Sequence, residues 1–116
     1  MNQQDLTKQI CKKCSKDTPK MSPSLIQQNI KNLDPDWQLI DGQTAIMRTL
    51  HFKGYKKGVK LANICAQLCS EQGHHCDFSF GWGYCTIKLT THAIHALSEN
   101  DFIMARHFDH AILKHI

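Results

Sequence analysis

Residues 37–72 read "WQLIDGQTAIMRTLHFKGYKKGVKLANICAQLCSEQ", and the hydrophobic period changes within this stretch. Across residues 37–52 apolar and polar side chains alternate, and Asp41-Gly42 interrupts them with a pair typical of hairpin turns. Across residues 55–72 the apolar side chains recur every three or four positions, and Gly73 follows where a helix commonly ends in a left-handed glycine. We therefore predict a β-hairpin followed by a helix.

A second hairpin and a last helix are expected downstream. Strands at residues 78–80 and 84–91 flank Gly81-Trp82-Gly83, and in the second of them alternate side chains belong on opposite faces. Ser98 is a suitable N-cap for the last helix, which carries acidic residues in its first turn and an apolar face beyond it.

A first helix is expected near residues 22–33, with a serine cap, Pro23 in its first turn and the "DPDW" stretch after its end. The predicted order is α-β-β-α-β-β-α. Because short hairpin connections favour antiparallel pairing, we expect an α+β fold with a four-stranded antiparallel sheet and three helices packed on one face. Residues 1–21 lack a sustained apolar period and are expected to form a loose N-terminal segment before a domain at residues 22–116.

The composition is that of one ordinary globular domain. The chain has 116 residues, of which 41% are hydrophobic and 21% charged. Residues 1–20 hold +3 of the net charge of +4, so the body lacks the basic surface of a nucleic-acid reader. We see no signal-peptide pattern and no apolar run of membrane-spanning length. We therefore expect a soluble cytoplasmic protein whose six cysteines are reduced.

Histidines gather at the ends of the predicted elements. His74 and His75 follow a helix, His92 ends a strand, and Asp101 lies in the first turn of the last helix. Side chains at element ends can converge on a pocket, and an imidazole can both donate and accept a proton near neutral pH. A carboxylate can orient such a ring. An acid–base pocket is one interpretation; packed histidines and a first-turn acid favoured by the helix dipole are the other.

A metal site is the alternative use of these residue types. Cys11-x-x-Cys14 has zinc-like spacing but no matching second pair. Cys65 and Cys69 could supply one, yet they fall on the apolar face of a helix. The neighbours His74, His75 and Cys76 are contiguous, so their side chains diverge. We therefore predict no metal.

One spacing is specific. His74-His75-Cys76 is followed by Trp82 after five intervening residues, by His92 after nine more and by Asp101 after eight more. This pattern, together with "TTHAIHALSENDFIMA" and the hairpin stretch quoted above, resembles the pterin-4a-carbinolamine dehydratases over roughly residues 23–112. The stretch "CKKCSKDTP" is similar to the leader of bacterial members that accompany phenylalanine hydroxylase.

The resemblance implies a function. It implies a hydro-lyase that dehydrates a 4a-hydroxytetrahydropterin to the quinonoid dihydropterin and recycles the pterin of an aromatic amino acid hydroxylase, with no cofactor or metal of its own. It also implies a homodimer or homotetramer that needs no nucleic acid or membrane. A non-catalytic dimerisation or regulatory module on the same fold is the alternative.

The resemblance also implies roles for individual residues. The catalytic group would be His74, His75, His92 and Asp101, with His74 and His92 as the acid–base pair, His75 mainly binding substrate and Asp101 supporting a histidine ring. Substrate contacts would come from the three histidines and from backbone or hydroxyl groups of Gly73, Thr90 and Thr91 at the pterin edge. Trp82 would be either a pocket wall or a core aromatic beside the hairpin.

Overall fold

The computed structural model describes residues 10–115. Its elements follow the predicted order and confirm the α+β class with an antiparallel sheet. They are α2 (Pro23–Ile30), β1 (Gln38–Ile40), β2 (Ala45–His51), α3 (Lys56–Gln72), β3 (Asp77–Gly81), β4 (Tyr84–Leu89), the 3₁₀ turn η1 (His92–Ile94) and α4 (Glu99–His115).

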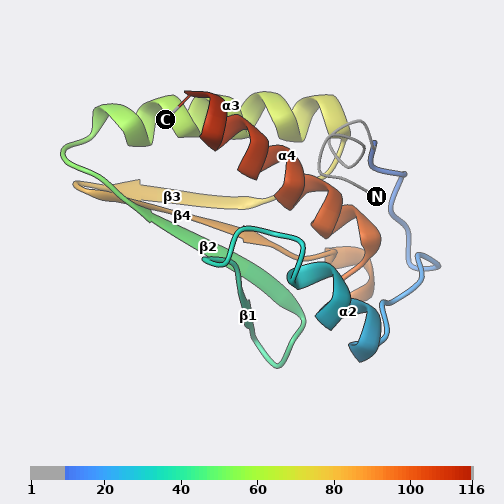
Figure 1. Cartoon of the computed structure of the whole chain (residues 1–116). Coiled ribbons are helices and arrows are strands. Elements are labelled where there is room, and N and C mark those ends of the chain that lie inside the picture. The colour runs from blue at the N-terminus through green and yellow to red at the C-terminus, as the bar shows by residue number, and fades with distance from the viewer. Residues whose placement is uncertain (1–9, 116) are drawn as a thin grey trace.

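The four strands form one sheet in the order β1-β2-β4-β3, with every neighbouring pair antiparallel. Each predicted hairpin supplies one half, and β2 and β4 join the halves at the centre. Helices α3 and α4 lie across one face of this sheet (Figure 1). Helix α2 packs beside α4, where the Arg106 guanidinium donates to Asn29 Oδ1 at 2.8 Å.

Local chemistry explains where the elements turn and stop. Asp41 and Gly42 have φ values of 53° and 65°, a left-handed conformation that suits the predicted turn. Gly73 ends α3 at φ 63°, also in the left-handed region, as expected of a glycine cap. In β4 the alternate residues Cys85, Ile87 and Leu89 are buried, which confirms the predicted two-faced pattern.

Strand β4 ends at Leu89, two residues before the predicted end at Thr91. Thr91 instead forms an isolated bridge with Ala96. Its hydroxyl donates to the Asp101 carboxylate at 2.8 Å, and the backbone then enters η1. A side-chain contact with α4 therefore takes the chain away from the sheet before His92.

The core lies between the sheet and α4. Its largest fully buried side chains include Phe102, Phe108 and Ile46. Near the far end of α4, Asp109 accepts hydrogen bonds from the Arg48 guanidinium at 2.6 Å and from Trp37 Nε1 at 2.7 Å. This buried ion pair attaches the first hairpin to α4, and removing one partner of such a pair is costly because a charge is left uncompensated.

The segment before α2 was expected to be loose. Its described part, residues 10–21, contains no helix or strand but is hydrogen-bonded to the body. The backbone of Lys12 exchanges two hydrogen bonds with the Asn100 side chain, at 2.9 and 2.6 Å, and Met21 N donates to Leu97 O at 3.1 Å. This part of the segment therefore lies against the start of α4. Among residues 10–115, no helix has the length and apolar character needed to cross a membrane.

Candidate active site

A cavity of about 260 Å³ lies where the C-terminal end of α3 approaches the end of β4. It collects six of the residues expected at the site, from segments far apart in the sequence. They are Gly73, His74, His75, Thr90, Thr91 and His92, joined by Lys13, Cys14 and Ala93. Its volume is near the lower end of the range for small-molecule pockets, which suits a compact ligand.

A larger cavity of about 780 Å³ lies elsewhere, between the N-terminal segment, α2 and the start of α4. None of the expected site residues lines it. Size alone would favour this cavity, but proton-transfer groups distinguish the smaller one. We therefore take the smaller cavity as the candidate active site.

His74 is fixed at the back of this cavity. Its ring is 6% exposed, and Nε2 lies 2.7 Å from Oδ1 of Asp101, which is fully buried. An ionised carboxylate can only accept hydrogen bonds, so Nε2 carries the proton and Nδ1 of the neutral ring keeps a lone pair. Asp101 does not line the cavity, so it acts on a ligand only through His74.

The other carboxylate oxygen of Asp101 is held by the fold. Oδ2 accepts a hydrogen bond from Thr91 Oγ1 at 2.8 Å and one from Ser98 N at 3.0 Å. Because the Thr91 hydroxyl proton goes to Asp101, the Ser98 hydroxyl donates in turn to Thr91 Oγ1 at 2.6 Å. This network fixes the carboxylate at the first turn of α4 and, through it, the orientation of the His74 ring.

The opposite ring nitrogen faces the N-terminal segment. Cys14 Sγ lies 3.6 Å from His74 Nδ1 and accepts a hydrogen bond from Asn100 Nδ2 at 2.9 Å. Cys14 and Lys13 are site residues that the sequence analysis missed at this position. No spacing pattern could have revealed them, because they reach the cavity only through the docking of the N-terminal segment.

Nearby thiols are electrostatically distinct. Burial is the main factor that raises the pKa of Cys11 from 9.0 to about 12, with the neighbouring Cys14 and Asp101 adding to the effect. Hydrogen bonding with Cys65 and Cys76 lowers the pKa of Cys69. Cys11 is therefore a protonated packing residue at neutral pH.

His75 and His92 are solvent-exposed at the cavity, one between α3 and β3 and the other at the first residue of η1. The hydroxyl groups of the two threonines have acceptors within the protein. The Thr90 hydroxyl donates to Thr44 O at 2.6 Å, and the Thr91 hydroxyl donates to Asp101. Both hydroxyl protons are therefore used within the protein.

Trp82 lies apart from these residues. It occupies the turn between β3 and β4, is 61% exposed, and lines neither cavity. Gly81 and Gly83 flank it. Gly83 has a φ of 85°, which the tight turn requires, whereas a Cβ atom at Gly81 would lie 2.6 Å from the Tyr84 ring. The exposure of Trp82 contradicts the alternative of a core aromatic, and its role as a pocket wall stays a prediction.

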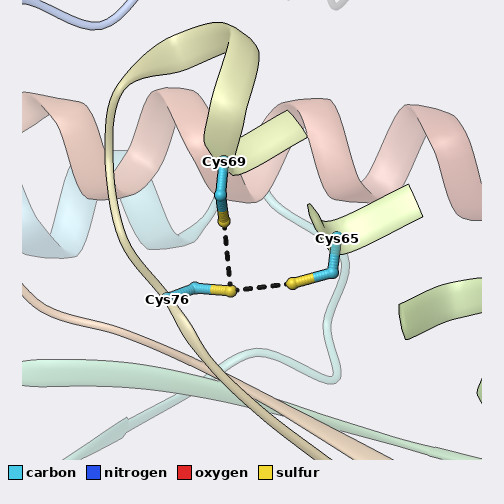
Figure 2. A group of neighbouring side chains, drawn as sticks. All are labelled: Cys65, Cys69 and Cys76. Atoms are coloured by element: carbon cyan, nitrogen blue, oxygen red, sulfur yellow. Dashed lines mark hydrogen bonds between the residues drawn. The ribbon is translucent and has the colours of Figure 1, made fainter. Parts of the chain in front are cut away.

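Within residues 10–115, one group of side chains could hold a metal ion. The sulfur atoms of Cys65, Cys69 and Cys76 all lie within 4.8 Å of one another. Figure 2 shows the three side chains converging. Cys76 directly follows His75, so this cluster adjoins the candidate active site along the chain.

Comparison with known proteins gives a consistent result. A family model described as pterin 4 alpha carbinolamine dehydratase matches residues 19–111. Three relatives carry the name "Putative pterin-4-alpha-carbinolamine dehydratase". The protein from Methylococcus capsulatus is 36% identical over 90% of each chain. That from Nitrosomonas eutropha is 36% identical over 95% of this chain and 96% of its own. The protein from Marinobacter nauticus is 37% identical over 90% of this chain and 96% of its own.

A solved structure shares the fold. The crystal structure of a transcriptional coactivator/pterin dehydratase from Brucella melitensis superposes with a TM-score of 0.73 at 25% sequence identity. The similarity covers 79% of this chain and 97% of that one.

Proposed function

The chain belongs to the pterin-4a-carbinolamine dehydratase family of hydro-lyases, and we propose that it removes water from 4a-hydroxytetrahydropterin through acid–base catalysis by His74 and His92. The observation that carries this proposal is the buried His74–Asp101 pair, which adjoins a cavity also lined by His75 and His92. The sequence resemblance had implied the same group of residues.

The reaction requires two proton transfers and no change in oxidation state. A proton must reach the 4a-hydroxyl group so that water can leave, and another must be taken from the neighbouring ring nitrogen to give the quinonoid dihydropterin. A histidine can serve in either role because its pKa lies near neutral pH, and one positioned group contributes about 10²–10⁴-fold to the rate.

His74 has the features needed to take a proton at Nδ1. Asp101 accepts the hydrogen bond from Nε2, so Nδ1 is the basic nitrogen of the ring, and the buried carboxylate stabilises the imidazolium once it forms. Asp101 is therefore a positioning residue. His92, which is exposed at the mouth of the cavity, is suited to exchange protons with the substrate hydroxyl and with water.

Substrate binding would use the remaining lining groups. His75 is exposed and can bond to the pterin edge, and Gly73, Thr90 and Thr91 would contribute backbone atoms because the threonine hydroxyls are engaged elsewhere. The substrate is the spent cofactor of an aromatic amino acid hydroxylase, so we propose functional coupling to such an enzyme in the cytoplasm. Assembly as a homodimer or homotetramer is part of the same proposal.

The test is a dehydration assay with His74→Ala and His92→Ala, following formation of the quinonoid product by absorbance. Each variant should lower kcat/KM by about 10²–10⁴-fold, the contribution of one acid–base group. His51→Ala is a matched control, because His51 is also exposed but lies at the end of β2 and does not line the cavity. Wild-type rates in both cavity variants would refute the assigned roles.

A non-catalytic dimerisation or regulatory module is the second candidate. It is favoured by one observation, the description of the Brucella melitensis protein as a coactivator as well as a dehydratase. If the wild-type chain failed to accelerate dehydration, while wild type and His92→Ala bound a purified hydroxylase or transcription factor equally well, this second function would replace the first.

A further inference from the structure

We propose that Cys65, Cys69 and Cys76 form a binding site for one soft, thiophilic metal ion. The ion would be held by three thiolates between α3 and the segment that carries His74 and His75. Cys76 Sγ lies 2.9 Å from Cys65 Sγ and 3.4 Å from Cys69 Sγ. The dehydration chemistry uses none of these thiols.

The backbone brings the three sulfur atoms together. Cys65 and Cys69 are one helical turn apart, so both project from the same side of α3. Gly73 then ends the helix in a left-handed conformation, and the chain reverses into β3 with Cys76 just before the strand. Figure 2 shows the Cys76 side chain pointing toward the other two.

The spacing suits a metal ion after small side-chain rotations. Sulfur atoms bound to one ion by bonds of ~2.3 Å are about 3.8 Å apart in tetrahedral geometry. All three sulfur atoms are within 4.8 Å of one another. The separations of Cys76 Sγ from Cys65 Sγ, 2.9 Å, and from Cys69 Sγ, 3.4 Å, are shorter than this tetrahedral spacing.

The donor set selects the class of ion. Within residues 10–115 the cluster contains only sulfur donors, with no carboxylate or imidazole among them. Thiolates prefer Cu(I), Zn(II) and related soft ions, whereas Mg²⁺ and Ca²⁺ require oxygen ligands. Cys65 is buried, but Cys69 and Cys76 are only partly so, which leaves a route for the ion to enter.

Ordinary packing explains an isolated cysteine but not this convergence. Cys85 is fully buried within the sheet and behaves as a small apolar side chain. Cys65, Cys69 and Cys76 instead point their sulfur atoms at one another from two segments. An ion between them would join the end of α3 to the start of β3, and because it binds the folded state it would stabilise the protein against heat.

The experiment uses the reduced full-length protein without oxygen and Cd²⁺ as the probe, because cadmium–thiolate bonds absorb in the ultraviolet. We expect one Cd²⁺ per chain, a rise in Tm, and no displacement by excess Mg²⁺. Alkylation of the wild type followed by mass spectrometry should show Cys65, Cys69 and Cys76 protected together when Cd²⁺ is bound.

Variants locate the ion. Cys69→Ser and Cys76→Ser should each weaken Cd²⁺ binding by at least about 100-fold, the upper range seen when ligand support is lost. The control is Cys11→Ser/Cys14→Ser, which removes the zinc-like pair and should leave Cd²⁺ binding unchanged. The proposal is overturned if Cd²⁺ binds only with the affinity of Mg²⁺, if the serine variants retain it, if the control variant loses it, or if the three thiols stay unprotected.

Discussion

Replacing Asp101 with asparagine should invert the hydrogen-bonding state of His74. Ser98 N is a backbone donor aimed at Oδ2 of Asp101, so the amide oxygen of an asparagine must occupy that position. Its NH₂ group then faces Nε2 of His74, in place of the carboxylate oxygen now 2.7 Å away. An NH₂ group cannot accept a hydrogen bond, so Nε2 loses its proton and Nδ1 gains it.

The size of the effect follows from this exchange. With its lone pair removed from Nδ1, His74 cannot act as a base there, and kcat/KM should fall by about 10²–10⁴-fold. The asparagine keeps its bonds to Thr91 and Ser98 but loses the charge-assisted bond to His74, which should cost about 1.5–3 kcal/mol of unfolding free energy.

The assay combines the dehydration rate, urea unfolding and the ring tautomer of His74 read from ¹⁵N chemical shifts. Asp109→Asn is the matched control, because it removes a second buried carboxylate of α4 that bonds to Trp37 and Arg48 rather than to a histidine. A folded Asp101→Asn protein with kcat/KM within about threefold of wild type would refute the reasoning. So would an unchanged His74 tautomer.

Three further predictions concern the rest of the molecule. Asp109→Asn should lower the unfolding free energy by about 3 kcal/mol in urea titrations, because the buried Arg48 guanidinium loses the negative charge of its 2.6 Å partner. A loss below about 0.5 kcal/mol would contradict this. Trp82→Ala should change kcat/KM less than about threefold, since the ring is exposed outside the cavity; a larger drop would return Trp82 to the site. Because the pKa of Cys11 is raised, its thiolate fraction at pH 8 should be roughly 10³-fold smaller than that of an ordinary cysteine. Iodoacetamide should therefore alkylate Cys11 slowly at pH 8 and faster only toward pH 12, as followed by mass spectrometry. Rapid alkylation at pH 8 would exclude the buried environment.

The parts of the fold that could be predicted depend mostly on residues close together in the sequence. The Asp41-Gly42 turn and the Gly73 helix end depend on backbone conformations that few residues adopt, so their positions are visible in the sequence. The alternation in β4 reflects which face meets the core. Each of these features is decided within a few residues of the chain.

The candidate site could be predicted only in part. The spacing of His74, His92 and Asp101 indicated a pocket through the family resemblance, and the cavity collects the two histidines. The inward direction of the Thr91 hydroxyl and the position of Cys14 could not be inferred, because both depend on contacts with α4 made by distant segments. The same applies to Cys76, whose approach to α3 depends on the reversal after the helix.

The two hydrogen bonds between the Lys12 backbone and the Asn100 side chain have a practical consequence for anyone preparing this protein. They hold residues that look dispensable against the cavity, so the leader forms one of its walls. Trimming the chain to the start of α2, a common step before crystallisation, would open His74 to bulk water on its Nδ1 side. A shortened enzyme that folded well but bound its substrate poorly would have lost this wall rather than any residue of its sheet or helices.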